Sequence, residues 1–346
     1  MYISGRNSSQ NFDENDEGDC TGGKWVCQIM VAEGVIGVLG NLLVCFVILR
    51  VKFLHNMTNY LLVNLAVADM LTCLTLFFYN LTVSPTCTLV RYVPNSSWQR
   101  ELLCRILASS YLGWAFSYIS AYSLCLVTLE RYVAVVHPLQ YARKLTVPRM
   151  ITLISLTWVI SFAATIPFLL INSPSDDPDK ACSEIKYPSE SFPVVVGVQG
   201  FLFAFLLPVA MMSWAYYKIQ VTLKRQAKAL NLRHARAAAY DLVIARQRLV
   251  SMLTLVLGAL IILWMPVYIS LICLHPTNTS TFLFCGSSSY VSARGILNFL
   301  FYLNSVINPF IYEFKYKKFQ QGLKVAFCGC FSGKGGNRVA TEMAPL

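Results

Sequence analysis

One carboxylate stands in the middle of a long apolar stretch. Asp69 lies in LLVNLAVADML, at the depth of a bilayer centre, where an ionisable side chain is costly and usually functional. Other apolar stretches place polar residues at a similar depth: Asn41, Ser120, Asn304, Ser305 and Asn308. Carboxylate, hydroxyl and amide oxygens suit a small hard cation. The pattern predicts a buried switch that responds to protonation or cation loss. A protonated, hydrogen-bonded acid without a role is the alternative.

A second ionisable group, Glu130-Arg131-Tyr132, ends the third apolar stretch within VTLERYVAVVHPLQY. At the inner membrane boundary Arg131 can stay charged while Glu130 pairs with it. This pair would hold the helix end until another group competes for the guanidinium. An arginine that only anchors the helix at the headgroups is the alternative. The surrounding sequence favours the switch.

Prolines interrupt three later stretches at Pro208, Pro266 and Pro309. A proline inside a membrane helix removes a backbone hydrogen bond and is tolerated as a hinge when the helix lies in a bundle. Trp264 stands just before Pro266 and predicts a bulky lever at that hinge, although core packing alone also explains it. We therefore expect the last three helices to move against the first four.

These groups must be positioned by membrane-spanning helices. Hydrophobic residues make up 56% of the 346-residue chain and charged residues only 13%, too few to cover a soluble protein. About 20 apolar residues span a bilayer core. Seven stretches meet that length: 27–51, 58–83, 102–135, 148–171, 192–217, 249–274 and 291–312. We predict an all-α membrane protein, a seven-transmembrane helix bundle with short loops.

Basic residues are unevenly distributed between the two sides of these stretches. With the N-terminus outside, 20 of the 28 Lys and Arg lie inside, and the outer side carries 8 of them against 12 acids. Since cytoplasmic loops are enriched in Lys and Arg, the net charge of +11 indicates topology and not nucleic-acid binding. The predicted organisation is an extracellular tail (1–26), a transmembrane domain (27–313), and a membrane-surface helix with a cytoplasmic tail (314–346), in the plasma membrane.

Modification signals follow the same topology. The sequons on the outer side, and therefore the candidate glycosylation sites, are Asn7, Asn80, Asn95 and Asn278. The external cysteines, which are free to pair, are Cys20, Cys27, Cys87, Cys104, Cys182 and Cys285. Cys328 and Cys330 follow a basic amphipathic segment at the inner face and are candidate palmitoylation sites.

The motifs also occur together and in one order. The set is Gly40-Asn41, Leu65–Asp69, Glu130–Tyr132, Trp158, Pro208 with Tyr216, Trp264–Pro266 and Asn308–Tyr312. It resembles the rhodopsin-like (class A) G-protein-coupled receptors over all seven stretches, from about Cys27 to Cys330. The resemblance implies a receptor and not an enzyme. It also implies a heterotrimeric G protein, an extracellular ligand, arrestin and membrane lipids as partners.

The resemblance implies a role for several residues on the outer side and in the membrane. Cys104 and Cys182 would form a disulfide between the third helix and the second external loop. The polar set around the buried acid would hold Na⁺, with no other cofactor: Asp69, Ser120, Asn304, Ser305 and Asn308.

On the inner side, the resemblance implies that Arg131, Tyr216 and Tyr312 rearrange to admit the C-terminus of a G-protein α-subunit. Leu139, after Pro138, would be a hydrophobic contact for the same partner. The segment 314–327 would form an eighth helix on the membrane surface, as its alternation of basic and apolar residues also indicates.

The chain departs from the family pattern at four places. The segment between Cys104 and Arg131 is two residues longer than usual, so a bulge is expected at the top of the third helix. Arg246 stands where some members have an acid that locks to the triplet arginine. Leu260 and Ala121 replace the usual Phe and Ile near the sixth-helix hinge. A weaker resting latch and altered transmission of a ligand signal are expected.

The ligand class is narrowed by absences in the sequence. A retinal photoreceptor would need a Lys within 291–312, which has none, and an amine receptor an acid within 102–129, which also has none. The residues and spacing of stretches one, two and seven resemble those of adenosine receptors. Their ligand-holding residues are absent, however, because Leu271 and Tyr302 replace an Asn and a His, and no Phe follows Cys182.

Helical spacing selects a candidate ligand pocket. Its residues are Trp114, Ser117, Tyr118, Tyr268, Leu271, Arg294, Asn298, Phe301 and Tyr302. Aromatic walls with a cation at the rim suit a ligand with an anionic or amide group, although such aromatics often only pack together. The acidic segment FDENDEGD instead favours a cationic peptide. A peptide and a small nucleoside-like molecule both stay open.

The sequence thus predicts a receptor that binds an extracellular ligand and activates heterotrimeric G proteins. The first alternative is a constitutively active or ligand-independent receptor, in view of Arg246, Leu260 and Ala121. A proton-coupled transporter or channel with Asp69 as relay is less favoured, because such a relay needs further ionisable groups across the membrane.

Overall fold

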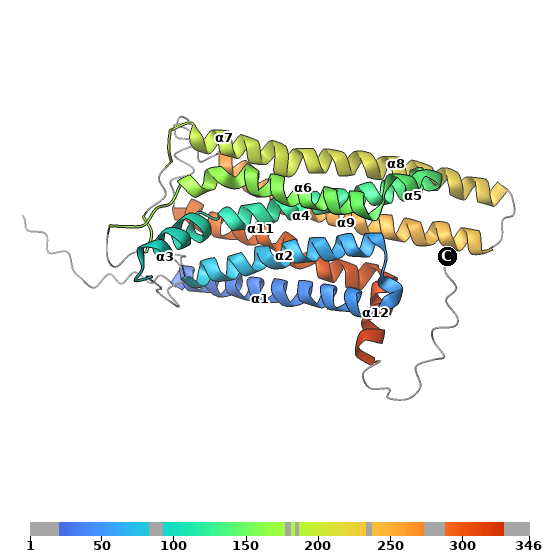
Figure 1. Cartoon of the computed structure of the whole chain (residues 1–346), viewed down its shortest axis with the longest axis horizontal. Helices are drawn as coiled ribbons and strands as arrows, with labels where there is room; N and C mark the ends of the chain where they lie inside the picture. The colour runs from blue at the N-terminus through green and yellow to red at the C-terminus, as the bar shows by residue number, and fades with distance from the viewer. Residues whose placement is uncertain are drawn as a thin grey trace, which may run out of the picture.

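The computed structural model describes residues 21–82, 93–176, 181–183, 187–232, 237–272 and 288–328 of the chain. Within these ranges, seven helical segments are long and apolar enough to cross a membrane. They lie side by side in one elongated bundle, and a short helix turns away from the bundle at one end (Figure 1). The prediction of seven spanning helices is confirmed.

Several spans are built from more than one helix. The first four are α1 (Thr21–Arg50), α2 (Met57–Thr82), α3 with α4 (Ser97–Leu102 and Tyr111–Val136) and α6 (Val147–Thr165). The last three are α7 with α8 (Phe192–Gln199 and Leu207–Leu232), α9 (Ala237–Ile272) and α11 (Ser288–Lys315). Two short helices, α5 (Tyr141–Lys144) and α12 (Lys317–Cys328), lie at one end, which we call the α12 side; we call the opposite end, where α1 begins and α3 lies, the N-terminal side (Figure 1).

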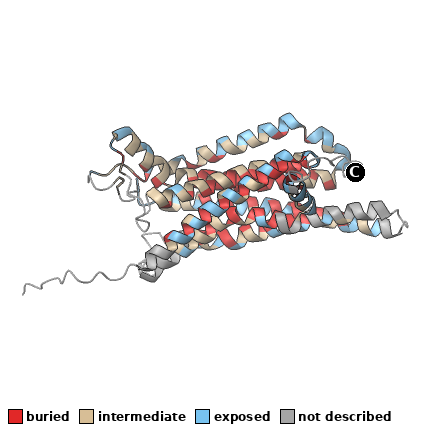
Figure 2. Ribbon diagram, turned by 90° about the horizontal axis from the view of Figure 1, so that it is seen from below, coloured by how far each residue is buried: buried red, intermediate tan, exposed pale blue. Residues whose placement is uncertain are grey.

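Helix α4 is the centre of the bundle. It packs against α2, α6 and α8, while α8, α9, α11, α1 and α2 contact one another in that order around it. Buried residues line the faces that the helices turn to each other (Figure 2). Large apolar side chains are also exposed on the outer faces, among them Leu39, Val159 and Ile262. Helices that are apolar on all sides need a lipid surrounding.

The third span is interrupted near its beginning. Leu103–Ala108 form a π-helical segment, and Ser110 has a φ of 60°, a left-handed conformation uncommon outside glycine. The Ser109 hydroxyl supports this break, because it donates to the Arg105 carbonyl and accepts a hydrogen bond from the Tyr111 amide. The extra length between Cys104 and Arg131 is taken up here. The predicted bulge is confirmed.

A second π-helical segment, Gly200–Leu206, stands between α7 and α8, directly before Pro208. Proline cannot donate to the carbonyl four residues earlier, so the wider turn accommodates the missing hydrogen bond. Pro266 and Pro309 lie inside the continuous helices α9 and α11. The three predicted hinge prolines therefore lie within spans, as expected.

Spans five and six extend further on the α12 side than predicted. Helix α8 continues to Leu232 and α9 begins at Ala237, whereas apolarity predicted an end at 217 and a start at 249. The added turns carry many charged residues. A criterion of apolar length finds the membrane-embedded part of a helix and misses a polar continuation.

Helix α12 agrees with the predicted eighth helix at 314–327, except that α11 continues to Lys315 before α12 begins at Lys317. It packs against α1 and α11. Gly322 permits the close approach, because a Cβ there would lie 2.6 Å from Leu54 Cδ1 and 3.3 Å from Val47 Cγ1. Any side chain at that position would push α12 away from the bundle.

Candidate functional site

Asp69 is fully buried where α2, α4 and α11 meet. Its Oδ1 accepts a hydrogen bond of 2.6 Å from the Ser120 hydroxyl, and its Oδ2 accepts one of 2.8 Å from Asn308 Nδ2. Ser305 adds a further side-chain hydrogen bond to the carboxylate. Four of the five residues of the predicted cation site are therefore brought together by three helices.

Several side-chain amide atoms of α1 and α11 have no hydrogen-bond partner among the described residues. Both side-chain polar atoms of Asn304, and the Oδ1 atoms of Asn308 and Asn41, are buried and unpaired. Asn41 Nδ2 donates to the carbonyls of Gly37 and Ser305, which joins α1 to α11. Orphaned buried polar atoms are rare and indicate a bound ion or water. The oxygen-rich donor set fits a small hard cation.

Glu130 and Arg131 form an ion pair at the end of α4, on the α12 side. Arg131 Nε lies 2.5 Å from Glu130 Oε2, and Arg131 Nη2 lies 2.9 Å from Oε1. Two neighbours also donate to the carboxylate: Thr58 from α2 at 3.0 Å and Tyr141 from α5 at 2.7 Å. We call these four residues the Glu130 lock. It holds the guanidinium against α4.

Tyr141 takes part in the lock as a neutral hydroxyl. Burial and its hydrogen bond to Glu130 raise the pKa of Tyr141 above its usual value. A raised pKa keeps the proton on the phenol at any physiological pH. Tyr141 was not predicted from the sequence. It begins the short helix α5, ten residues after Arg131, and no repeating pattern in the sequence indicates a contact between these two elements.

Tyr216 and Tyr312, which were predicted to rearrange together with Arg131, make no hydrogen bond to it among the described residues. The Tyr216 hydroxyl is 2.7 Å from Thr128 Oγ1, and the buried Tyr312 hydroxyl has no hydrogen-bond partner. Tyr132 packs against Trp214, with ring centroids 5.1 Å apart. The lock is thus closed while the predicted hydrogen-bond network of Arg131, Tyr216 and Tyr312 is not formed among the described residues.

An aromatic cluster fills the bundle between Asp69 and the N-terminal side. Trp264 stacks on Phe301 at 4.9 Å, and Phe301 contacts Trp114 at 5.0 Å. Trp114 in turn stacks on Phe168 at 5.5 Å, and Trp264 contacts Tyr268 at 6.4 Å. The predicted lever and three predicted pocket residues therefore form one continuous stack from α4 through α11 to α9.

Of the other predicted pocket residues, four have described side chains and two do not. Ser117 and Tyr118 are buried in α4, Tyr302 lies beside Phe301 at 5.3 Å, and Asn298 is exposed on α11. The side chains of Leu271 and Arg294 lie outside the described residues, and so does that of Arg246. The predicted cation at the rim, Arg294, therefore has no described contact.

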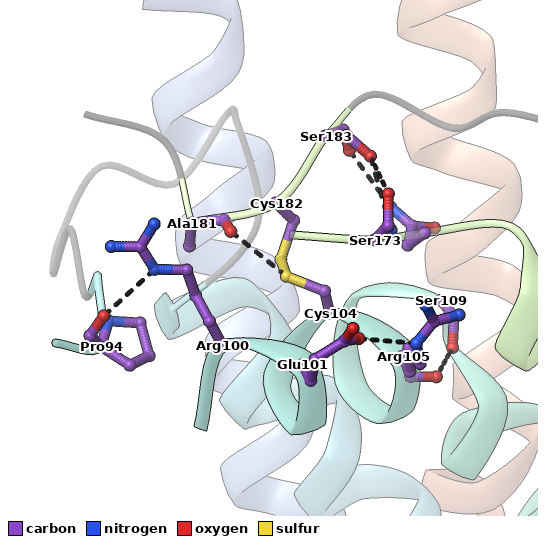
Figure 3. Close-up of a disulfide and its surroundings, with 11 residues drawn as sticks. Pro94, Arg100, Glu101, Cys104, Arg105, Ser109, Ser173, Ala181, Cys182 and Ser183 are labelled. Atoms are coloured by element: carbon purple, nitrogen blue, oxygen red, sulfur yellow. Dashed lines mark hydrogen bonds and ion pairs between the residues drawn. A yellow bond between two sulfur atoms is a disulfide. The ribbon is translucent and has the colours of Figure 1, made fainter. Parts of the chain in front are cut away.

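The predicted disulfide between Cys104 and Cys182 is present and joins the third span to the loop before α7 (Figure 3). Around it, Arg105 pairs with Glu101 and Arg105 Nη1 donates to the Leu169 carbonyl at 3.2 Å. Cys27 is also disulfide-bonded. The Cys104–Cys182 bond fastens the loop before α7 to the third span on the N-terminal side of the bundle.

The modification candidates have different surroundings. Asn95 is exposed before α3, as a glycan acceptor must be. Asn80 is 2% exposed within α2 and donates to the Leu76 carbonyl, so its burial contradicts the prediction of a glycan there. Leu139 is 99% exposed on the α12 side. Asn7, Asn278 and Cys330 lie outside the described residues, and Cys328 ends α12 with its side chain undescribed.

One buried acid was assigned wrongly from the sequence. The count of external acids included Glu33, but this residue lies within α1 and is 4% exposed. Neither of its carboxylate oxygens has a hydrogen-bond partner among the described residues. The available signal was an acid inside the apolar sequence VAEGVIGVLGN, the same signal that identified Asp69.

Helix α4 contributes to all three groups: Ser120 to the Asp69 cluster, Trp114 to the aromatic stack, and Glu130 with Arg131 to the lock. The sequence profile of the "7 transmembrane receptor (rhodopsin family)" matches residues 40–312. The chain belongs to this family and is a multi-pass G-protein-coupled receptor of the rhodopsin-like class, not an enzyme.

Three known proteins show the range of its relatives. Trace amine-associated receptor 1 of Mus musculus is 28% identical over 308 residues, 87% of each chain. Trace amine-associated receptor 5 of Mus musculus is 32% identical over 313 residues, 87% of this chain and 84% of the relative. Somatostatin receptor type 1 of Rattus norvegicus is 28% identical over 335 residues, 95% of this chain and 77% of the relative. Their names refer to trace amines and somatostatin, whereas the motifs had suggested adenosine receptors.

Proposed function

We propose that this chain, with its N-terminus outside the plasma membrane, binds an extracellular ligand at the N-terminal side and activates a heterotrimeric G protein from the α12 side. The Glu130 lock carries the proposal. It holds Arg131 by charge at the end of the central helix, close in sequence to the fully exposed Leu139. A partner that binds Leu139 and competes for Arg131 would open the lock.

The path from ligand to lock is supported by contacts along α4 and its neighbours. Trp114 lies at the pocket end of the aromatic stack and Trp264 at its inner end, just before the proline in α9. A ligand that moves Phe301 must move Trp264, because stacked rings in a packed core have no free volume. A tilt of α9 about Pro266 would then open the α12 side.

Arg131→Ala is expected to reduce receptor-dependent nucleotide exchange on a G protein at least about tenfold, a loss of 1.4 kcal/mol in coupling. The guanidinium is the group that an open lock would offer to the partner. The measurement is GTP-analogue uptake by purified G proteins of each class, mixed with receptor in lipid nanodiscs. Arg100→Ala, which removes an arginine from the N-terminal side, is the control. Equal exchange by wild type and Arg131→Ala would refute the proposed coupling.

We also propose that Asp69, Ser120, Asn304, Ser305 and Asn308 hold Na⁺ and thereby stabilise the resting state. The ion would supply a positive charge that offsets the cost of the buried carboxylate. The unpaired oxygens of Asn304 and Asn308 support this assignment, since each would gain a partner.

If so, NaCl raises the thermal unfolding midpoint of the receptor above that in choline chloride at equal ionic strength, and Asp69→Asn removes the difference. At a Na⁺ concentration ten times the dissociation constant, binding stabilises by about 1.4 kcal/mol. Asp176→Asn, at an exposed loop position, keeps the difference. A sodium effect that survives in Asp69→Asn would mean that the ion binds elsewhere.

The ligand is the least constrained part of the proposal. A small nucleoside-like molecule and a peptide were both predicted, and the names of the relatives add trace amines and somatostatin. The aromatic walls suit either a small aromatic molecule or an aromatic side chain of a peptide.

A constitutively active receptor is the second candidate. Leu260 and Ala121 are both fully buried in the core between the aromatic stack and the lock, where a smaller Ala leaves less to hold α9 in place. The measurement that separates the candidates is exchange by the wild type without ligand, against Arg131→Ala as background. High exchange without ligand favours the second candidate.

Further partners belong to the same proposal. Membrane lipids would contact α12, which presents Lys317, Lys318 and Lys324 beside an apolar face, the composition of a helix that lies on an anionic leaflet. Palmitoylation of Cys328 or Cys330 would anchor the end of that helix. Arrestin would compete with the G protein for the opened α12 side, and glycans would occupy the exposed external sequons such as Asn95.

A further inference from the structure

Glu33 is a second carboxylate inside the membrane bundle, separate from the Asp69 cluster. It lies eight residues before Asn41 on α1, about 12 Å nearer the N-terminal side at 1.5 Å per residue. Gly37, one turn below it, packs so tightly that a Cβ would overlap Cys73 Sγ and lie 3.1 Å from Val306. Glu33 therefore points along the face of α1 that meets α2 and α11.

The side chain lacks any partner among the described residues. Both oxygens are buried and make no hydrogen bond. The described basic residues near that end are engaged elsewhere: Arg105 pairs with Glu101, and Arg100 donates to the Pro94 carbonyl. An unpaired carboxylate inside a membrane protein is expensive. A group that supplies positive charge and hydrogen-bond donors would remove that cost.

The surroundings of Glu33 connect it to the aromatic pocket through Tyr302. Gly37 of α1 meets Cys73 of α2 and Val306 of α11, and Glu33 and Tyr302 each lie one helical turn before this contact on helices that both run toward the α12 side, which brings Glu33 next to Tyr302. Tyr302 is in ring contact with Phe301 of the aromatic stack. On α4, Gly113 has no side chain, and a Cβ there would lie 3.3 Å from the Tyr302 hydroxyl. Tyr302 is thus the element shared by the pocket and the acid.

The positions of the buried acids decide where the positive charge of a ligand could be bound. The third span carries no acid from 102 to 129, so its part nearer the N-terminal side offers a cationic ligand no negative charge. The acids buried within the described bundle are Glu33, Asp69 and Glu130. Asp69 is hydrogen-bonded to Ser120 and Asn308, and Glu130 belongs to the lock. Glu33 is the buried acid that remains free for a ligand.

We propose that Glu33 and Tyr302 form a subsite of the ligand pocket that binds an organic ammonium group, the charge of the ligand being held from α1 instead of α4. This inference deepens the proposed function and rests on it. An ammonium ion donates up to three hydrogen bonds, two of which the Glu33 oxygens accept. The faces of Phe301 and Trp114 add cation–π attraction along the approach.

An organic cation fits better than a metal ion. Na⁺ and Ca²⁺ need several oxygen ligands in one shell, whereas the described residues beside this part of α1 include Cys73, Phe77 and Tyr302, which offer a thiol, an aromatic ring and a phenol. The ammonium group itself can come from a small amine or from the lysine side chain of a peptide. The two sources share this chemistry and differ in size.

The test uses the full-length receptor in nanodiscs and measures ligand binding as a shift of the thermal unfolding midpoint, without any G protein. The probes are 2-phenylethylammonium, its uncharged analogue 2-phenylethanol, and Nα-acetyl-lysine amide, each in buffer without added salt and then in NaCl. The variants are wild type, Glu33→Gln and, as a matched control, Glu190→Gln, which neutralises an exposed acid on the same side.

The expected result is that at least one of the ammonium probes stabilises wild type and Glu190→Gln, and binds Glu33→Gln at least about tenfold more weakly, 1.4 kcal/mol in affinity. 2-Phenylethanol shifts none of them in a Glu33-dependent way. The probe with the larger shift identifies the source of the ammonium group. Unliganded Glu33→Gln is expected to be at least as stable as wild type, since it removes an unpaired buried acid.

Three outcomes would overturn the proposal. The first is equal binding of the ammonium probes by wild type and Glu33→Gln, or no binding to wild type. The second is a loss of stability in unliganded Glu33→Gln, which would show that the carboxylate already has a partner. The third is Glu33-dependent stabilisation by NaCl alone, which would assign the site to a metal ion. All three leave the Arg131→Ala exchange assay unaffected, so failure here is distinct from failure of G-protein coupling.

Discussion

Glu130→Gln is expected to raise ligand-independent nucleotide exchange on the partner G protein severalfold. The Glu130 carboxylate accepts four hydrogen bonds, two from Arg131 and one each from Thr58 and Tyr141. Glutamine keeps the shape but loses the charge and one acceptor, so the guanidinium is no longer held. Breaking a buried ion pair costs about 3–5 kcal/mol, and the 21% exposure of the arginine side chain reduces this to roughly 1–3 kcal/mol.

Under the proposed switch that loss falls on the resting state, which is the state that the closed pair stabilises. A change of 1.4 kcal/mol shifts a two-state equilibrium tenfold, so a resting receptor moves measurably toward the open state. The exchange assay compares equal amounts of wild type and Glu130→Gln. Glu101→Gln is the matched control, because its pair with Arg105 has side chains 46% and 42% exposed and contributes little. Unchanged or lower exchange in Glu130→Gln would show that the lock does not restrain the receptor.

Cys104→Ser is expected to lower the free energy of unfolding by about 2–3 kcal/mol and to reduce the fraction of receptor that reaches the cell surface. The bond joins residues 78 positions apart. Chain entropy alone would give a larger value, but membrane helices keep their structure when the bundle opens, so fewer conformations are gained on reduction. The loss also frees the loop that covers the N-terminal side, and ligand binding should weaken with it.

The measurements are thermal unfolding of purified receptor and surface labelling of cells. Cys104→Ser/Cys182→Ser is expected to match either single variant, because both remove the same bond. Cys125→Ser, at a free buried cysteine of α4, is the control and should cost much less. A double variant much less stable than the singles would mean that the cysteines contribute separately, by packing.

The spanning helices could be predicted from the sequence because the membrane imposes a minimum apolar length. The polar ends of α8 and α9 could not, since beyond the membrane a helix needs no apolar run and the chain there is charged. The bulge in the third span was predicted from a spacing. Its form, a π-helical segment followed by a left-handed Ser110, depends on how the disulfide and α4 are both accommodated.

The candidate site shows the same division. Asp69, Ser120 and Asn308 were predicted as a group because polar residues in apolar helices are few, and the bundle brings them within hydrogen-bond distance. Thr58 and Tyr141 were missed. Their hydrogen bonds to Glu130 come from the start of α2 and from the short helix α5, and no repeating sequence pattern predicts contacts between separate elements. The sequon at Asn80 was misinterpreted, because a motif says nothing about burial.

The sequence by itself determined that the chain spans a membrane seven times and belongs to a signalling family, because apolar length and the order of motifs are properties of the chain. Only the tertiary structure decided which polar groups have partners. Asp69 and Glu33 are both acids in apolar stretches, and their sequences do not distinguish them. Packing of the described parts of α1, α2, α4 and α11 gives hydrogen bonds to Asp69 and none to Glu33, because hydrogen bonding depends on which helix faces meet.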